Sequence, residues 1–109
     1  MNYKTTEKTS RAIKIFVEVE GAEIARAYIY IIFNGLHDDP YALLEDVFVA
    51  EGHRGQGHGK EIIKAVVEEA KKQGCYKLIG TSRYEREKVH KLYLDLGFED
   101  YGKEFRINL

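Results

Sequence analysis

The sequence predicts an α+β domain in which a β-sheet packs against two main helices. The first half of the chain carries runs of alternating or continuous β-branched and aromatic residues, which are typical of strands, with turn residues between them. The second half carries two stretches with apolar residues at helical spacing. With 109 residues the chain is long enough for one compact core and too short for two. Residues 11–109 are therefore expected to form one domain, and the polar, aperiodic residues 1–10 a flexible N-terminal arm.

The first two strands are expected to form a hairpin. Apolar and polar residues alternate from Ile13 to Val19, which indicates a half-buried strand, and Glu20-Gly21-Ala22 supplies the turn. The run from Ile24 to Phe33 is almost uninterrupted in β-branched and aromatic residues. Such a run is typical of a strand covered on both faces, so we expect it near the centre of the sheet.

A third strand is expected from Leu43 to Val49, after the turn-forming residues 34–40. The first helix follows residue 60, since apolar residues recur there at helical spacing until Gly74 ends the pattern. Residues 75–81 then hold the short apolar pair Leu78-Ile79, which indicates another buried strand.

The second helix is expected to begin at a capping box formed by Ser82 and Glu85 and to end at Gly97. A last pair of short strands is expected at residues 98–101 and 105–109.

Residues 54–60 read Arg-Gly-Gln-Gly-His-Gly-Lys, with a glycine at every second position between two basic residues. Glycine lets the backbone come close to a ligand, so that successive N–H groups can converge on phosphate oxygens. A helix that begins here adds its unpaired N–H groups and the positive end of its dipole. The segment is therefore predicted to be an anion cradle suited to a pyrophosphate, and the alternative is a purely structural glycine turn.

Two other phosphate-binding motifs do not fit this spacing. Glu61 follows Gly59-Lys60, where the nucleotide-triphosphate P-loop requires Ser or Thr, and Arg54 stands where that motif requires its first glycine. The dinucleotide-binding pattern also fails, because its third glycine would fall on Lys60.

Composition excludes several classes of partner. A net charge of −1 gives no positive field for nucleic-acid binding. The single Cys75 cannot form an internal disulfide, and no stretch has the composition of a membrane span or a signal segment, so a cytoplasmic location without membrane contact is expected. His53 and His58 have no third ligand nearby in the sequence, so no metal site is expected.

Three motifs occur in a specific order. The chain reads Leu-Glu-Asp-Val-Phe-Val from Leu44 to Val49, then Arg54-x-x-Gly57-x-Gly59, and later Leu92-Tyr93-x-x-Leu96-Gly97-Phe98. Together they resemble the GNAT superfamily of acyl-CoA-dependent N-acyltransferases, whose acetyl-CoA loop reads Gln or Arg, two residues, Gly, one residue, and Gly or Ala. The resemblance covers about residues 11–109. It implies a central mixed, mostly antiparallel sheet whose strands splay apart around the acyl-CoA site.

The resemblance also implies acetyl-CoA as the co-substrate. The strand ending at Val49 and the one from Tyr76 would splay apart, and the pantetheine arm would bond to the backbone of Val47, Phe48 and Val49. The pyrophosphate would lie on the backbone amides of Arg54, Gly55, Gln56, Gly57, His58, Gly59 and Lys60. Arg86 stands where many family members have an Asn near the cofactor.

Two catalytic residues are implied. Tyr93 occupies the position of the family's general-acid tyrosine, although a helical aromatic can also be a core residue. Glu45 is the candidate base, with Asp46 as the competing choice. Because side chains alternate along a strand, only one of these two carboxylates is expected to face the acceptor cleft. A solvated or salt-bridged pair at a strand end is the structural alternative.

The implied function is transfer of an acetyl group from acetyl-CoA to a primary amine, and the alternative is a non-catalytic acetyl-CoA-binding or protein-interaction module. Family members begin with a strand and two helices that form one wall of the acceptor pocket, whereas only residues 1–10 precede the hairpin here. We therefore expect an acceptor cleft that is open, or that a second copy completes in a homodimer. Its acceptor would be a small-molecule or protein amine.

Overall fold

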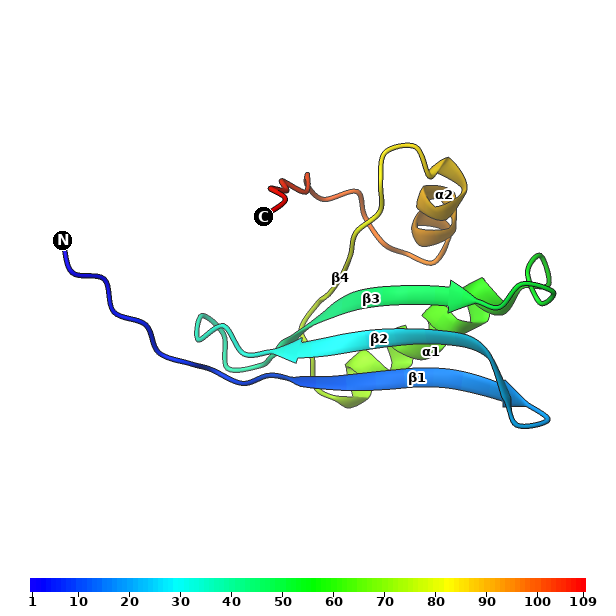
Figure 1. Ribbon diagram of the computed structural model, residues 1–109, viewed down its shortest axis with the longest axis horizontal. Coiled ribbons are helices and arrows are strands. Elements are labelled where there is room, and N and C mark those ends of the chain that lie inside the picture. Colours follow the sequence, from blue (N-terminus) through cyan, green and yellow to red (C-terminus); the bar gives the residue numbers. More distant parts are fainter.

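The computed structural model describes residues 1–109 as one four-stranded sheet with two helices (Figure 1). The elements in chain order are β1 (Arg11–Val19), β2 (Ala22–Ile32), β3 (Tyr41–Val49), α1 (His58–Lys72), β4 (Leu78–Gly80) and α2 (Glu87–Asp95). The order along the chain agrees with the order expected from the sequence.

The sheet is mixed and mostly antiparallel. Its strand order is β1-β2-β3-β4, with antiparallel pairs β1–β2 and β2–β3 and a parallel pair β3–β4. The predicted central position of β2 is therefore confirmed. Glu20 and Gly21 form the tight turn between β1 and β2 and both have positive φ angles, 52° and 81°, which a type I′ turn requires at both of its central residues.

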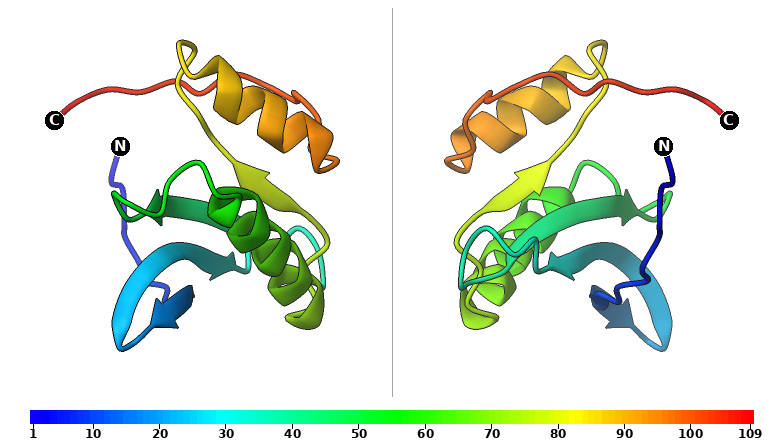
Figure 2. Two further views of the ribbon diagram at one scale, coloured as in Figure 1. Left: turned by 90° about the vertical axis from the view of Figure 1, so that its right-hand side faces the viewer. Right: turned by 90° about the vertical axis from the view of Figure 1, so that its left-hand side faces the viewer.

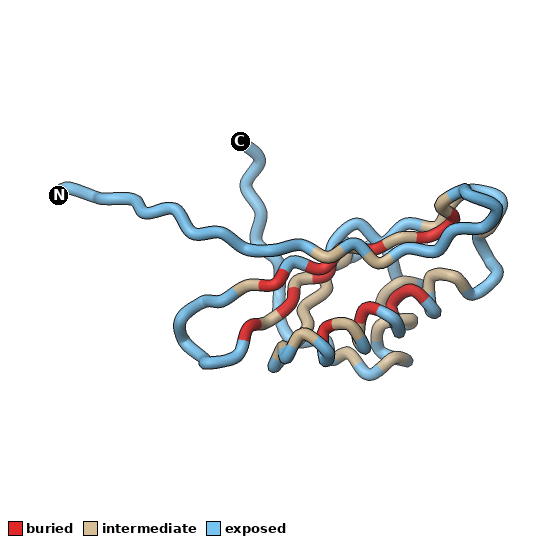
Figure 3. The backbone as a smooth tube through the Cα atoms, turned by 90° about the horizontal axis from the view of Figure 1, so that it is seen from below, coloured by how far each residue is buried: buried red, intermediate tan, exposed pale blue.

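The core lies between α1 and one face of the sheet (Figure 3). Ile29 and Ile31 of β2 are fully buried there against Ile63 and Val66 of α1. We call the opposite side of the sheet the open face. There Tyr30 is 39% exposed, so the prediction that both faces of β2 are covered is wrong. The reason is that α1 packs on one side only.

The helix ends agree with the sequence, but one helix start does not. Gly74 and Gly97 follow the two helices with φ angles of 76° and 98°, the left-handed conformation that commonly ends a helix. The predicted capping box is wrong, because α2 begins at Glu87 with Arg86 as its N-cap and no side chain caps it.

No strands form at residues 98–101 or 105–109, which also corrects the prediction. These short segments pair with no other strand, and a strand needs partners for its backbone groups. Residues 1–10 extend away from the sheet in Figure 1, and all of them are exposed. The radius of gyration is 15.9 Å, whereas a compact chain of this length would have roughly 13 Å. No helix has the length and apolar character needed to cross a membrane.

Candidate functional site

The sheet opens between β3 and β4. The two strands pair only through Ala42–Leu78, Leu43–Ile79 and Leu44–Gly80, and β3 then continues to Val49 with β2 as its one partner. Figure 2 shows β4 leading away from β3 toward α2. From Glu45 onward, the edge of β3 that faces away from β2 is therefore free. We call residues 45–49 the free edge, and it contains Val47, Phe48 and Val49.

The glycine-rich loop connects this free edge to α1. Gly55 and Gly57 have φ angles of 76° and 87°, and Gly57 is the N-cap of α1 in the left-handed conformation. No backbone N–H from Arg54 to Lys60 donates a hydrogen bond within the chain, and the first helical bond runs from the Glu61 N–H to the Gly57 carbonyl. The amides of residues 58–60 belong to the first turn of α1 and lie at the positive end of its dipole, which is an arrangement that binds anions.

Arg54 joins the loop to the end of β3. Its Nε donates to the Val49 carbonyl oxygen at 2.9 Å, and its guanidinium carbon lies 5.6 Å from the centre of the Phe48 ring. Gln56 makes a longer bond within the loop, from Nε2 to the Gly52 carbonyl oxygen at 3.4 Å. Only one nitrogen of Arg54 is engaged, so the terminal nitrogens of the guanidinium keep their donors for an anion.

The remaining loop side chains do not fill the cradle. His58 is half-buried, and Lys60 is exposed and forms no ion pair within the chain. Gly59 lies inside α1, where an added Cβ would only touch the Val49 Cγ2 at 4.0 Å. This spacing fits an alanine at position 59, whereas the positive φ of Gly57 disfavours any side chain there.

Tyr93 lies beside the point where β3 and β4 part. A Cβ added to Gly80 would lie 3.7 Å from its ring and 3.5 Å from Leu44, so the phenol rests on β4 next to β3. The Tyr93 ring also packs on Phe98 with centroids 5.0 Å apart. Burial raises the pKa of the Tyr93 hydroxyl, Arg86 counteracts this rise with its positive charge, and Glu45 adds to it with its negative charge. The fold thus brings the predicted Tyr93, Glu45 and Arg86 into one electrostatic neighbourhood.

Glu45 stands on the open face with no hydrogen bond or ion pair to the rest of the chain. It pairs with Tyr28 across the ladder to β2. Its carboxylate borders an open depression of about 470 Å³, which is also lined by Ser10, Tyr30, Ile32, Leu43 and Asp46.

Asp46 does not point away from Glu45, which corrects the expectation from strand alternation. Asp46 has a φ of 51°, and Ala27 of β2 has no single partner, since Tyr28 pairs with Glu45 and Arg26 with Phe48. This is a β-bulge, and it interrupts the alternation so that both carboxylates line the same depression. A possible signal was an aspartate within an apolar run, since Asp is depleted in regular strands.

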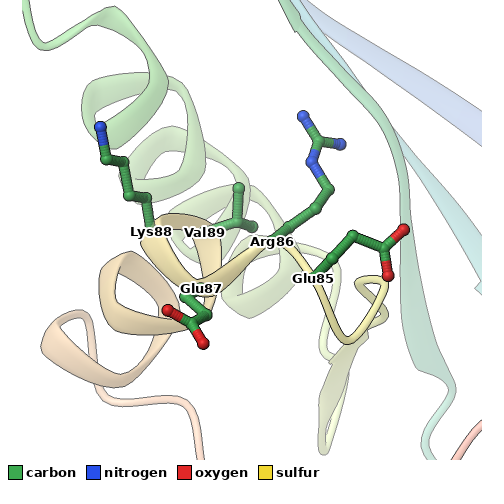
Figure 4. A pocket seen from close by; sticks show the side chains of 5 residues that line it. All are labelled: Glu85, Arg86, Glu87, Lys88 and Val89. Atoms are coloured by element: carbon green, nitrogen blue, oxygen red, sulfur yellow. The ribbon is translucent and has the colours of Figure 1, made fainter.

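Arg86 stands at the start of α2, at the margin of a second open depression of about 440 Å³ formed by residues 85–89. Figure 4 shows Arg86, Lys88 and Val89 projecting to one side of the helix start and Glu87 to the other. Lys88 was not among the predicted site residues, and only the position of α2 in the fold places it here.

The sequence indicated Ser82 as a helix cap and not as a residue of the site. Its Oγ is buried without a hydrogen-bond partner, two residues after β4 ends and on the β4 side of the opening. A buried hydroxyl of this kind is costly unless a partner satisfies it. No three His, Cys, Asp or Glu side chains converge in a way that could hold a metal ion.

Comparisons with known proteins place this geometry in a family. The model of the acetyltransferase (GNAT) family matches residues 3–98. The chain is 37% identical over 79 residues to the aminoglycoside N(6′)-acetyltransferase type 1 of Serratia marcescens. The aligned residues cover 72% of this chain and 53% of that protein. The chain is 38% identical over 66 residues to the glucosamine 6-phosphate N-acetyltransferase of Trypanosoma brucei brucei, 61% of this chain and 43% of that protein. The chain thus spans about half the length of these two relatives.

Solved structures are similar over most of the chain. An acetyltransferase of Trypanosoma brucei superposes with a TM-score of 0.80 at 28% identity, over 90% of this chain and 69% of that one. The aminoglycoside acetyltransferase AAC(6′)-Iy, in complex with the bisubstrate analogue CoA-S-monomethyl-acetylneamine, superposes with a TM-score of 0.73 at 25% identity, over the same shares. Because the family model spans the chain from the N-terminal arm to the residue after Gly97, this protein belongs to the acetyltransferase (GNAT) family.

Proposed function

We propose that this chain binds acetyl-CoA and transfers its acetyl group to a primary amine. One observation carries the proposal. The free edge of β3 runs between two groups suited to this reaction, the unpaired amides of the glycine-rich loop at one end and the Tyr93 hydroxyl near Glu45 at the other.

The chain's own groups fit the parts of acetyl-CoA. The amides from Arg54 to Lys60 offer donors to a pyrophosphate, and the free edge offers backbone groups to the amides of the pantetheine arm. Acetyl-CoA supplies the activated acetyl thioester.

Glu45 is the proposed base. An alkylamine with a pKa of about 10.4 is roughly 99.9% protonated at neutral pH, so freeing its lone pair costs about 4.6 kcal/mol. Glu45 is exposed beside the open depression and has no partner in the chain, whereas the Asp46 carboxylate accepts a hydrogen bond from Arg26. This difference favours Glu45 over Asp46 as the acceptor of the amine proton, directly or through a water.

Tyr93 is the proposed acid. A tyrosine with the ordinary pKa of about 10 is protonated at neutral pH, and burial raises the pKa of the Tyr93 hydroxyl further. Its ring is fixed against Gly80 and Phe98, so the hydroxyl has a defined position from which it can protonate the departing thiolate.

The proposed acceptor is the primary amine of a small molecule. Two relatives are named for acetylation of an aminoglycoside and of glucosamine 6-phosphate, and the depression beside Glu45 is open enough for a bulky amine. A protein amine is the alternative acceptor, and a second copy of the chain is the candidate to cover the open face.

The proposal is tested by binding and turnover with the same preparation. Calorimetry with acetyl-CoA measures binding, and thiol released in the presence of amino sugars, aminoglycosides, a polyamine or a lysine peptide measures transfer. The protein must be removed before thiol detection, because Cys75 is itself a free thiol. Binding without release from any amine would favour the non-catalytic module, and absence of binding would refute the proposal.

A matched pair of glycine substitutions tests the anion cradle. Gly57 and Gly21 have similar φ angles of 87° and 81°, and a Cβ added to either meets no atom within 4 Å. Alanine at either site is therefore expected to cost a similar roughly 1–2 kcal/mol of unfolding free energy. Gly57→Ala should also weaken acetyl-CoA binding by about tenfold or more, because the cradle amides turn away from the ligand.

Gly21→Ala should leave binding unchanged, since Gly21 lies in the β1–β2 turn. Equal affinities for Gly57→Ala and Gly21→Ala would contradict the assignment of the loop.

A further inference from the structure

The bulge in β3 is strained at one residue. Asp46 is one of only two non-glycine residues with a positive φ, and the other, Glu20, lies in a tight turn where such an angle is expected. Within a strand, a non-glycine residue in this conformation costs free energy and persists only when its surroundings hold it there. Asp46 therefore needs a contact that fixes its position.

Arg26 supplies that contact from the neighbouring strand. Its Nε donates to Asp46 Oδ2 at 2.9 Å, and its guanidinium carbon lies 4.5 Å from the centre of the Phe48 ring. The side chains of Asp46 and Phe48 thus bracket the bulge, and the same guanidinium holds both. Arg26 is in turn fixed by Glu23, which accepts from Nη1 at 3.3 Å and also pairs with Lys14.

The bulge determines which side chains and backbone groups of residues 45–49 face the open face and the free edge. Glu45 and Phe48 both stand on the open face, and Val49 stands toward α1, where it approaches Gly59. In a regular strand an odd spacing would place Glu45 and Phe48 on opposite faces. Removing the bulge would therefore turn over the residues after it and exchange the backbone groups that face β2 with those that face the free edge.

We propose that Arg26 is a positioning residue that acts through Asp46 and Phe48 to hold this bulge, so that the free edge and Glu45 are both set for acetyl-CoA and the amine. This inference rests on the proposed function. Arg26 touches neither reactant and works by keeping the backbone of β3 in its irregular course. An alternative hypothesis is that the positive charge of Arg26 attracts the substrate. The variants below distinguish this alternative from the positioning role.

The test uses the fact that glycine adopts a positive φ without help. Arg26→Gln removes the contacts of the guanidinium and should weaken acetyl-CoA binding by about tenfold and also lower kcat, because the strain at Asp46 is no longer held. Asp46→Gly relieves the strain at its source. The double variant R26Q/D46G should therefore bind acetyl-CoA as D46G does, and both should bind it more tightly than R26Q.

Lys14→Gln is the matched control, because it removes another cation of the same ionic cluster without touching the bulge. It should leave both the affinity for acetyl-CoA and kcat unchanged. The inference is overturned if R26Q behaves like the wild type, if R26Q/D46G binds as weakly as R26Q, or if Lys14→Gln weakens binding as much as R26Q does.

A ligand-free measurement separates this inference from the proposed function. Backbone chemical shifts of residues 45–49 should move in R26Q and return in R26Q/D46G whether or not acetyl-CoA binds. If the wild type binds no acetyl-CoA, the proposed function fails, but the chemical shifts still test the role of Arg26. Unchanged chemical shifts in R26Q would refute that role. Should R26Q not fold, Arg26→Lys keeps the charge but loses the forked contacts, and it should show the same shifts in part.

Discussion

The environment of the Tyr93 hydroxyl is set by burial and by two nearby charges. Burial raises its pKa, the positive charge of Arg86 lowers it, and the negative charge of Glu45 raises it. The ring has little freedom, because Gly80 and Phe98 hold it from two sides. The ring also packs against the core cluster, so the proposed role as an acid rests on the hydroxyl and not on the ring.

Removing the Tyr93 hydroxyl should lower turnover without weakening binding. Tyr93→Phe keeps the ring packing, so KM for acetyl-CoA should stay within about twofold while kcat falls by about a hundredfold, the usual contribution of a general acid. Tyr84→Phe is a suitable control, since Tyr84 is 78% exposed. A proportional loss in both variants, or an unchanged kcat in Tyr93→Phe, would contradict the role.

The same variant tests the raised pKa through stability. A group whose pKa is higher in the folded than in the unfolded state favours folding below the unfolded value, about 10 for tyrosine, and this preference is lost as pH rises through the folded pKa. Unfolding free energies measured between neutral and alkaline pH should therefore fall less steeply for Tyr93→Phe than for the wild type.

Not every residue of the candidate site could be predicted from the residues next to it in the sequence. Glu45 and the loop glycines could be proposed from the sequence, because the motifs that resemble the family are local stretches of the chain. The position of Asp46 could not, because a bulge depends on a neighbouring strand, here on Arg26 twenty residues earlier. The burial of the Ser82 hydroxyl and the packing of Tyr93 on Gly80 likewise depend on the tertiary fold.

Among the elements, α2 is held most weakly. It has no fully buried residue and reaches the core through the partly buried side chains of Leu92, Tyr93 and Leu96, followed by Phe98. By contrast, α1 contributes four buried residues to the same core. Elements with few buried contacts open locally at lower free energy than the rest of the domain.

Hydrogen exchange should reveal this difference. The amides of α2 are expected to exchange faster than those of β2 in the free protein, because β2 is paired on both sides and buried on its α1 face. Acetyl-CoA should slow exchange in α2 and in the glycine-rich loop together, since it would bridge them. Equal protection of α2 and β2 without ligand would contradict this expectation, as would a ligand effect confined to β2.

The elements themselves were largely predictable, for reasons visible in their residues. Strands and helices with a buried side follow from apolar spacing, and Gly74 and Gly97 mark helix ends through their left-handed backbone. The capping box failed because Ser82 turns into the interior instead of capping a helix. The prediction of the last two strands failed because residues 98–101 and 105–109 pair with no other strand.

At the scale of the whole molecule, stability rests on a small core. Only 12 of the 109 residues are buried, and nine of them form one cluster between α1 and the sheet. Single core substitutions should therefore remove a large share of the roughly 5–15 kcal/mol that stabilises a typical domain.

Ile29→Ala tests this dependence, because Ile29 is fully buried at the centre of β2. It should reduce the unfolding free energy by roughly 2–5 kcal/mol, measured by denaturant titration. Phe33→Ala removes a larger side chain that is 66% exposed just after β2 and should cost much less. Similar losses in the two variants would show that the core is not where the structure places it.

The hydrogen bond from the Arg54 side chain to the Val49 carbonyl joins the glycine-rich loop to the last residue of the free edge. Together with the short connection between them, it restricts how far the loop can move from the edge. Once the loop holds the diphosphate of a ligand, the rest of that ligand is tethered beside the free edge. Its effective concentration there is then far above its concentration in solution. The nucleotide end of such a ligand is remote from the reacting bond, but its binding to the loop would position the thioester next to Tyr93.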